Sequence, residues 1–367
     1  MKYYRLDRIK EACPDASYYM IIGERSNGKT FASLEYGLKK YFEDGSQLAY
    51  IRRWDEDIRG KRGATIFDGL IYNKVIDKLS KGKWDGVYYY SGRWFLTKTA
   101  KDGGVIKDDK PFAYAFSLNS MEHDKSTSYP WIRTIIFDEF LSRGRGLGDD
   151  EFVLLMNVLS TIIRDPSRTD IEIFLLANTV NFDSIYFKEF GIENIRNMKQ
   201  GTIDIYTYGE NSTVKMAVEY CENAKDKQSR INDRYFAFNN PRLKMITEGA
   251  WEMDIYPHSP CKWKPKDVLF SYFIQYNDDL LQADIIQVED NYFTFIHRKT
   301  TPIQDTEHDL IFSNFINPRP NYRMNLWKPE DTMGKDIKNF FTFNRVYYQD
   351  NVIGEIVNNY NNWCTTV

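Results

Sequence analysis

Residues 23 to 30, "GERSNGKT", have the residue types and spacing of a phosphate-binding loop. Gly23, four intervening residues, and then Gly28, Lys29 and Thr30 match the pattern G-x-x-x-x-G-K-[ST] without a gap. In such a loop backbone N–H groups surround phosphate oxygens, the lysine reaches the β- and γ-phosphates, and the hydroxyl ligates Mg²⁺. The pattern therefore predicts a site for ATP and Mg²⁺, with these residues binding the nucleotide: Gly23, Glu24, Arg25, Ser26, Asn27, Gly28, Lys29 and Thr30. The alternative is a strand–turn–helix corner that carries a surface lysine.

A second acidic motif follows later, in "RTIIFDEF", residues 133 to 140. Its β-prone apolar stretch ends in Asp138 and Glu139, and ligand sites of α/β proteins lie at the carboxyl ends of strands. There Asp138 would help to hold Mg²⁺, and Glu139 would polarise a water for attack on the γ-phosphate. The pair predicts ATP hydrolysis and not binding alone. The alternative is an acidic strand end that caps the next helix.

The next apolar stretch, "IEIFLLANTV", ends in an amide, Asn178. At a strand end beside the phosphate-binding loop, this amide would hydrogen-bond the γ-phosphate or the attacking water. A turn asparagine that caps its own loop is the other interpretation.

Two arginines, Arg164 and Arg168, close a helical stretch in "STIIRDPSRTD". They complement the helix dipole, or one of them is a catalytic arginine finger inserted into a neighbour's ATP site, which would require a ring. Arg143 and Arg145 are weaker candidates for the same role. A further basic run, residues 51–63, is either a solvated loop or a contact to phosphates, another subunit or DNA.

These motifs require a sheet that brings their ends together. Strands and helices alternate over the first two hundred residues, which favours a parallel sheet with crossover helices. The expected strands are Tyr18–Ile22, Leu48–Arg52, Phe112–Leu118, Thr134–Phe137 and Ile171–Ala177. The expected helices are Lys29–Phe42, Ile66–Leu79 and Asp150–Ile163, and an inserted hairpin turns at Ser91-Gly92.

The pattern changes after about residue 205. Thr213–Lys227 is expected to form a helix in a charged connecting region, and strands follow in "DVLFSYFIQY", "LLQADIIQV" and "NYFTFIHRKT". Two late helices are expected near Thr332–Phe341 and Arg345–Tyr360. We predict a P-loop ATPase domain at residues 1–205, a linker at 206–248 and a smaller α/β domain at 249–367.

Composition limits the possible classes of protein. The chain has 367 residues, of which 42% are apolar and 16% aromatic, enough for sizeable cores. No apolar run approaches the roughly 20 residues of a membrane span, and the N-terminus has no apolar signal region. Four scattered cysteines suggest reduced thiols in a cytosolic compartment. A net charge of −3 means that any contact with DNA comes from local patches.

In these motifs the chain resembles the DNA-packaging ATPases of φ29-type tailed phages, which are relatives of terminase large subunits. The resemblance is carried by the order of "GERSNGKT", "YIRRW", "AYAFSLNS…SYPWIRTIIFDEF", "VLSTIIR" and "LLANTVNFDSIYF", over residues 18 to 190. It implies an additional-strand, RecA-like P-loop ATPase and a homopentameric ring at the capsid portal, in the host cytoplasm. It also implies an RNase H-like C-terminal domain, often without nuclease activity. A structural packaging RNA is a partner in the best-known member, although nothing in this sequence demands one.

One polar segment, "SLNSMEHDKSTSYP" at residues 117–130, is a candidate for DNA contact. It centres on Lys125 with hydroxyl side chains beside it, which suits phosphate contact without base readout. By resemblance, the corresponding loop of φ29-type motors faces the central channel and grips DNA. The alternative is a solvated surface loop.

The C-terminal strands lack the carboxylates of a working nuclease, which would need three or four converging on metal ions. The segments "VLFSYFIQY" and "NYFTFIHRK" carry no acid, Asp284 lies in "QADIIQV", and Glu289 and Asp290 fall in a turn. We therefore expect a scaffold or DNA-contact domain, a vestige of a nuclease. The leading hypothesis is an ATP-driven ring that moves double-stranded viral DNA into a preformed capsid. The alternatives are a terminase large subunit with an active metal-dependent nuclease, and a P-loop ATPase that is not coupled to DNA.

Overall fold

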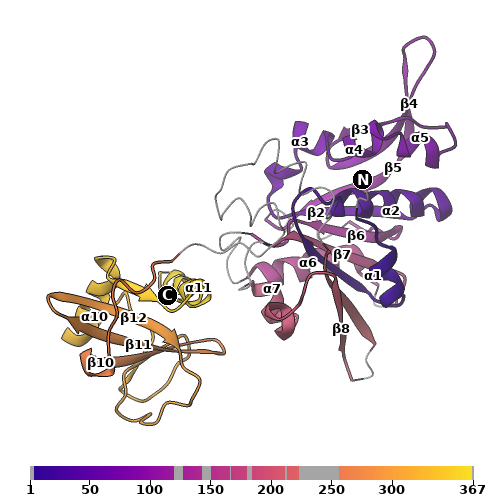
Figure 1. Cartoon of the computed structure of the whole chain (residues 1–367). Coiled ribbons are helices and arrows are strands. Elements are labelled where there is room, and N and C mark those ends of the chain that lie inside the picture. The colour runs from indigo at the N-terminus through magenta and orange to yellow at the C-terminus, as the bar shows by residue number, and fades with distance from the viewer. Residues whose placement is uncertain are drawn as a thin grey trace. The chain divides into compact units, whose positions relative to one another are not determined.

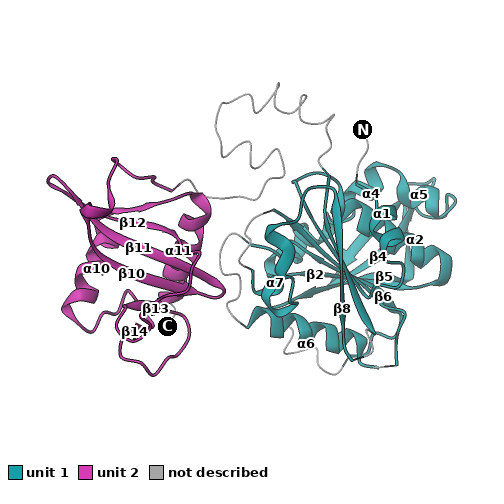
Figure 2. Cartoon of the chain, turned by 60° about the horizontal axis from the view of Figure 1, so that its bottom comes forward, with its two compact units in different colours: residues 1–252 teal, residues 253–367 magenta. Residues whose placement is uncertain are grey.

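The chain forms two compact units, residues 1–252 and 253–367, coloured separately in Figure 2. The computed structural model describes residues 4–119, 127–142, 150–165, 167–179, 184–210, 213–222 and 256–365. Each unit has its own sheet and its own hydrophobic core.

The first unit is built on a nine-stranded sheet in its described residues, with the order β3-β4-β5-β2-β6-β7-β1-β9-β8. Pairing is parallel from β5 through β9, and antiparallel at the two edges, where β3 and β4 extend one side and β8 the other. The strands are β1 (Tyr18–Gly23), β2 (Gln47–Arg52), β3 (Gly86–Tyr90), β4 (Arg93–Thr99), β5 (Val105–Ser117), β6 (Ile132–Asp138), β7 (Glu172–Asn178), β8 (Thr202–Tyr208) and β9 (Val214–Tyr220). The parallel sheet with crossover helices is confirmed, as is the hairpin, because β3 and β4 meet at Ser91-Gly92.

Strand β7 lies between β1, which ends in the phosphate-binding loop, and β6, which ends in Asp138. A strand inserted at this place is what distinguishes additional-strand P-loop ATPases from simpler P-loop folds. The carboxyl ends of β2, β6, β7 and β1 are consequently adjacent (Figure 1). They end in Arg52, Asp138, Asn178 and Gly23, respectively.

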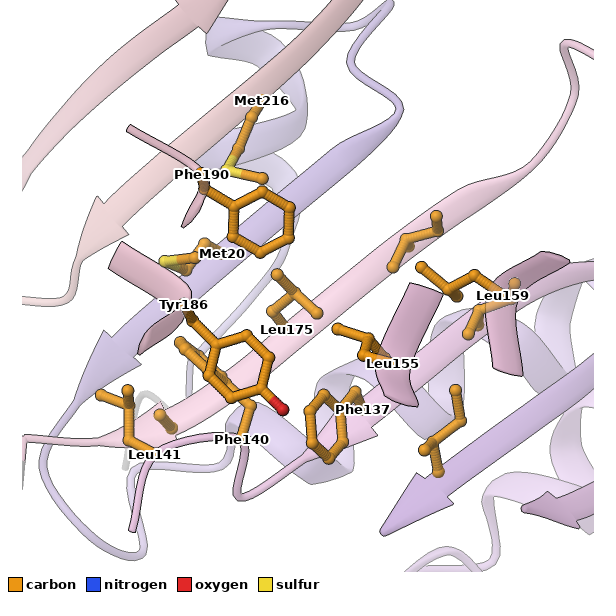
Figure 3. Packing of buried hydrophobic residues seen from close by; sticks show 14 of the residues in the cluster. Met20, Phe137, Phe140, Leu141, Leu155, Leu159, Leu175, Tyr186, Phe190 and Met216 are labelled. Carbon is orange, nitrogen blue, oxygen red and sulfur yellow. The ribbon is translucent and has the colours of Figure 1, made fainter. Parts of the chain in front are cut away.

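Helices cover both faces of this sheet (Figure 1). They are α1 (Asp7–Ala12), α2 (Lys29–Asp44), α3 (Gly60–Ala64), α4 (Asp68–Tyr72), α5 (Val75–Leu79), α6 (Glu151–Ile163) and α7 (Ile185–Glu189), with short 3₁₀ turns at Asp55–Asp57 and Glu193–Arg196. Alternate residues of the central strands point to opposite faces, so Met20 and Phe137 pack with α6 and α7, whereas Tyr19 and Ile136 pack with α1, α2, α4 and α5. Figure 3 shows the first of these cores.

The expected helix at Thr213–Lys227 is wrong, because Val214–Tyr220 is strand β9, paired in parallel with β1. Its two charged side chains have partners far away in the sequence. Lys215 contacts Asp15 at 2.5 Å, and Glu219 accepts a hydrogen bond from Tyr4 at 2.6 Å. The expected linker from residue 206 is corrected accordingly, because β8 and β9 belong to the sheet of the first unit.

The expected helix Ile66–Leu79 is divided into α4 and α5. Lys74 lies between them with φ 54°, in the left-handed region that a continuous helix does not allow.

Among the described helices of the whole chain, none has the length and apolar character that crossing a membrane requires.

The second unit contains a six-stranded sheet in its described residues, with the order β14-β13-β10-β11-β12-β15. The strands are β10 (Val268–Tyr276), β11 (Asp279–Val288), β12 (Asn291–Arg298), β13 (Ile311–Ser313), β14 (Tyr322–Arg323) and β15 (Val346–Tyr348), and a 3₁₀ turn at Pro265–Asp267 precedes them. Three antiparallel strands, with β13 and β14 added in parallel on the other side of β10, give the RNase H-like order.

Two helices, α10 (Thr332–Thr342) and α11 (Asn351–Cys364), supply the core on one side of this sheet. The expected helix from Arg345 is wrong at its start, because Val346–Tyr348 pairs with β12. Helix α11 begins only after Asp350, whose side chain accepts a hydrogen bond from the N–H of Ile353 at 2.9 Å.

Candidate active site

The loop between β1 and α2 places strict demands on the residue type at three of its positions. Gly28 has φ 98°, a left-handed conformation that favours glycine, and Ser26 adopts φ 59°. At Gly23 the constraint is space, because an added Cβ would lie 2.8 Å from the Cβ of Cys221. Burial raises the pKa of Cys221 to about 12, so this thiol is neutral packing behind the loop.

The amine of Lys29 lies inside the loop, and the residue is 6% exposed. It donates hydrogen bonds to the carbonyl oxygens of Gly23 at 3.2 Å and Glu24 at 2.8 Å, and to the side-chain oxygen of Asn27 at 3.2 Å. Asn178, at the end of the neighbouring strand β7, accepts from the same amine at 3.4 Å. The predicted lysine and the predicted amide of the site are therefore in contact, and the loop closes around a cation.

Thr30 and Asp138 meet across the gap between α2 and β6. The Thr30 hydroxyl lies 3.2 and 3.1 Å from the two carboxylate oxygens of Asp138. A hydroxyl beside a carboxylate is the oxygen donor set that Mg²⁺ prefers, so these residues fit the ion that the sequence predicts. Tyr50 also donates to Asp138 at 2.7 Å, and burial raises the pKa of that phenol well above its usual value, so it stays a donor.

Glu139, the residue after Asp138, has a left-handed backbone conformation with φ 58°. Its N–H donates to the Asp138 carboxylate at 3.0 Å, and its exposed side chain forms an ion pair with Arg52 at 2.7 Å. Arg52 closes β2 and also lies 3.7 Å from Asp138, so one guanidinium touches both acidic residues of the motif.

The remaining loop residues surround this centre. Glu24 and Asn27 are buried, whereas Arg25 is exposed with Ser26 at the tip of the loop. The exposed position of Arg25 leaves it accessible to a ligand from outside the loop.

The structure separates two predicted residues from this centre. Helix α6 connects the carboxyl end of β6 to the amino end of the parallel strand β7, so Arg164, which follows α6, lies at the opposite edge of the sheet from Lys29. Arg164 is exposed there. The guanidinium of Arg168 donates to the carbonyl oxygens of Tyr129, at 3.4 Å, and Ile132 in the same chain. Lys125 lies outside the described residues, as do Arg143 and Arg145.

Residues missed by the sequence reasoning complete the site. Tyr50 gave no signal, because an aromatic residue in an apolar strand is expected in the core. Arg52 and Arg53 were noted only as part of a charged run. Arg53 is 7% exposed and pairs with Glu151 across 98 positions in the sequence, a contact that local patterns do not reveal.

The second unit has a partly buried Asp–His pair on its sheet. Asp284 of β11 accepts from Ser271 at 2.6 Å and from Gln282 at 2.9 Å, and lies 3.1 Å from His297 of β12. Burial opposes ionisation of Asp284, but these hydrogen bonds outweigh it and lower its pKa, and the bond to Asp284 raises the pKa of His297. Throughout the described ranges, no three His, Cys, Asp or Glu side chains gather as a metal centre.

Comparison with known proteins places these features in a family. Residues 9–207 match the family described as "Podovirus DNA encapsidation protein (Gp16)", which is more than half of the chain. The DNA packaging proteins of Bacillus phages B103 and phi29 are each 26% identical over 174 residues, or 47% of this chain. The matched region spans about half the length of these relatives, 47% and 46% respectively.

A solved structure of the bacteriophage Phi-29 viral genome packaging motor assembly has the same fold. It covers 97% of this chain and 98% of its own, with a TM-score of 0.55 at 17% identity. The family match, together with the loop, the acidic pair and the inserted strand, leads to one conclusion: the chain belongs to the Podovirus DNA encapsidation protein (Gp16) family.

Proposed function

We propose that this protein is an ATP-driven motor that moves double-stranded viral DNA into a preformed capsid, working as a homo-oligomeric ring. The observation that carries the proposal is the contact of Thr30, at the start of α2, with Asp138, at the end of β6, beside Lys29 and Glu139. These residues unite a phosphate-binding loop with an acidic pair in a family named for DNA encapsidation. The printed names of the relatives, DNA packaging proteins of two Bacillus phages, support the same activity.

In the proposed mechanism the loop binds the phosphates of ATP through its N–H groups, and Lys29 exchanges its carbonyl partners for phosphate oxygens. Thr30 and Asp138 would hold Mg²⁺, which neutralises charge on the phosphates. Glu139 orients and polarises the attacking water, and Asn178, already within 3.4 Å of Lys29, contacts the γ-phosphate or that water. Catalysis of this kind depends on positioning and electrostatics.

The position of Arg164 supports a ring. Arg164 follows α6 and lies at the edge of the sheet opposite the nucleotide loop of its own chain. An arginine finger at that position does not reach its own ATP site, so it would act in the site of a neighbouring subunit. Arg168 is the second candidate, and its guanidinium donates to carbonyl oxygens of its own chain.

The partners and setting are proposed on the same basis. DNA would be gripped through Lys125, and the ring, a pentamer, would assemble at the capsid portal in the host cytoplasm. The second unit would serve as a scaffold or DNA-contact domain, since the two carboxylates in its described strands are already held, Asp284 by His297 and Ser271 and Asp279 by Arg298. A structural packaging RNA is required by no observation here.

The test is Glu139→Gln, which keeps the shape of the side chain and removes its basicity. ATP binding should persist while turnover falls by about 10²–10⁴-fold, the range for loss of a general base. Binding is measured with a fluorescent ATP analogue and turnover by phosphate release. Glu43→Gln on the exposed side of α2, where Glu43 pairs with Lys39, is the matched control and should behave as the wild type. Near-normal hydrolysis by Glu139→Gln would remove Glu139 from the mechanism.

A further inference from the structure

A buried ion pair lies directly behind the turn that carries Glu139. The Nε of Arg53 is 2.9 Å from both carboxylate oxygens of Glu151, and one terminal nitrogen is 2.8 Å from the same carboxylate. The two terminal nitrogens also donate to backbone carbonyl oxygens, at 3.2 Å to Glu139 and 2.6 Å to Phe140. Strand β2, the end of β6 and the start of α6 therefore meet at one guanidinium.

The burial of this pair restricts what it can do. The side chain of Arg53 is 8% exposed and that of Glu151 is 3% exposed, so neither has the access that binding ATP or DNA would require. A guanidinium keeps its proton in proteins, so its charge must be met by acceptors within the fold. The acceptors are Glu151 on one side and the two carbonyl oxygens on the other.

Those two carbonyl oxygens belong to the residues whose conformation fixes the catalytic carboxylate. Glu139 has φ 58°, which an L residue with a side chain rarely adopts and which persists only where the surroundings hold it. Arg52 contacts the side chain of Glu139, whereas Arg53, one residue on, contacts its backbone.

A third residue holds the pair from the other side. Tyr186 of α7 donates to Glu151 at 2.7 Å, and its ring packs on Phe140 with ring centres 5.4 Å apart. Figure 3 shows Tyr186 beside Phe140 and Phe137 in the core. Burial, and then the charge of Glu151, raises the pKa of Tyr186, so its hydroxyl remains a donor.

We propose that Arg53, held by Glu151, is a positioning residue for ATP hydrolysis, and that it fixes the left-handed backbone of Glu139 so that the carboxylate meets the attacking water. This inference rests on the proposed ATPase function. Stability alone does not require the pair, because apolar residues of similar volume can replace a buried ion pair with little loss. What apolar residues cannot do is donate hydrogen bonds to the two carbonyl oxygens.

The first variant is Arg53→Lys in the full-length chain, which keeps the charge but loses the planar fork that reaches Glu151 and both carbonyl oxygens. We expect kcat to fall about a hundredfold, the effect of a displacement of about 1 Å, while the Kd for ATP stays within about threefold of the wild-type value. Arg133→Lys is the matched control, because Arg133 lies at the other end of β6 and pairs with Asp44 and Asp170. Its kcat should be unchanged.

The second variant is Arg53→Met combined with Glu151→Leu, which removes the pair without leaving an unpaired buried charge. It should melt cooperatively and bind ATP, and kcat should again be about a hundredfold lower. Wild-type kcat in this folded variant would overturn the proposal. A parallel loss of ATP affinity, or failure to fold, would also overturn it, because the pair would then support the whole unit and not Glu139 in particular.

A double-mutant cycle identifies the target. If Arg53 acts through Glu139, then adding Arg53→Lys to Glu139→Gln should lower the residual rate no further. An additional hundredfold loss would show that Arg53 acts elsewhere. If instead the wild-type chain hydrolyses no ATP, the proposed function fails and not only this inference.

Discussion

At the scale of single residues, Lys29 is the side chain on which the proposed ATP site most depends. The structure places its amine among carbonyl oxygens of its own loop, at distances from 2.8 to 3.2 Å, so the loop is shaped around a positive charge. No other lysine lies in the loop, and the neighbouring cation, Arg25, is exposed at its tip. In the proposed site, one side chain inside the loop would thus supply the charge that meets the β- and γ-phosphates.

Lys29→Ala should therefore abolish ATP binding, because nothing else inside the loop can neutralise the phosphates. The measurement is a titration with a fluorescent ATP analogue. Lys39→Ala is the control, since Lys39 lies on the exposed side of the same helix and pairs with Glu43 at 3.7 Å. Tight binding by Lys29→Ala would mean that the loop had been misinterpreted.

The sequence predicts these residues well where the chemistry is local. The phosphate-binding loop, the Asp138–Glu139 pair and Asn178 each follow a recognisable strand, and the structure brings all of them together. Tyr50 and Arg53 could not be predicted, because their partners, Asp138 and Glu151, lie 88 and 98 positions away. Only the order of strands in the sheet makes them neighbours.

At the scale of elements, strands β11 and β12 are joined by a pair formed by the buried Asp284 and the partly buried His297, which makes the second unit sensitive to pH. The folded-state pKa of His297 is raised, so its contribution to stability is complete below about pH 6.5 and is lost as pH rises through that higher pKa. The folded-state pKa of Asp284 is lowered, so its contribution is present above about pH 4 and is lost as pH falls through that lower pKa. The pair stabilises the fold most between these limits.

His297→Gln should lower the free energy of unfolding of the second unit by about 1–2 kcal/mol near pH 6 and remove the loss of stability above pH 6.5. Denaturant unfolding at a series of pH values measures both effects. His308→Gln is the control, because His308 pairs with Asp305 on the exposed surface, where solvent and salt weaken the interaction. An identical pH profile for wild type and His297→Gln would contradict this account.

Elements were predicted where their periodicity is undisturbed, as in β1, β6, β7, α6 and the three strands β10 to β12. The failures have physical causes. The sequence of β9 resembles a charged helix because charged side chains such as Lys215 and Glu219 are usually exposed to solvent. In the structure Asp15 and Tyr4, from distant parts of the chain, are their partners. Strand β15 is only three residues long, and it is a strand only because β12 pairs with it.

At the scale of the whole molecule, subunits of the proposed ring would complete one another's sites. Arg164 follows α6 at the edge of the sheet opposite Lys29, so a single chain does not bring the two together. A finger supplied by a neighbour is worth about 10³–10⁵ in rate.

Mixing Arg164→Ala subunits with Glu139→Gln subunits should therefore restore part of the hydrolysis that each variant lacks alone. The restored sites have an intact Glu139 and receive Arg164 from a neighbour. Phosphate release is measured on the mixtures, with co-assembly checked by sizing. In the control, subunits carrying both changes are mixed with Arg164→Ala subunits, which leaves no finger and should stay inactive. If co-assembled mixtures recover nothing, Arg164 does not act in trans.

The central claim, that ATP hydrolysis by this chain drives DNA, is tested most directly by the rate of phosphate release from the full-length protein with and without double-stranded DNA. The coupled motor predicts that turnover rises with DNA concentration, and that the rise weakens as salt screens the phosphate contacts. It also predicts that Glu139→Gln shows no rise at any DNA concentration. ATP turnover that is the same with and without DNA would contradict the account and leave a P-loop ATPase that is not coupled to nucleic acid.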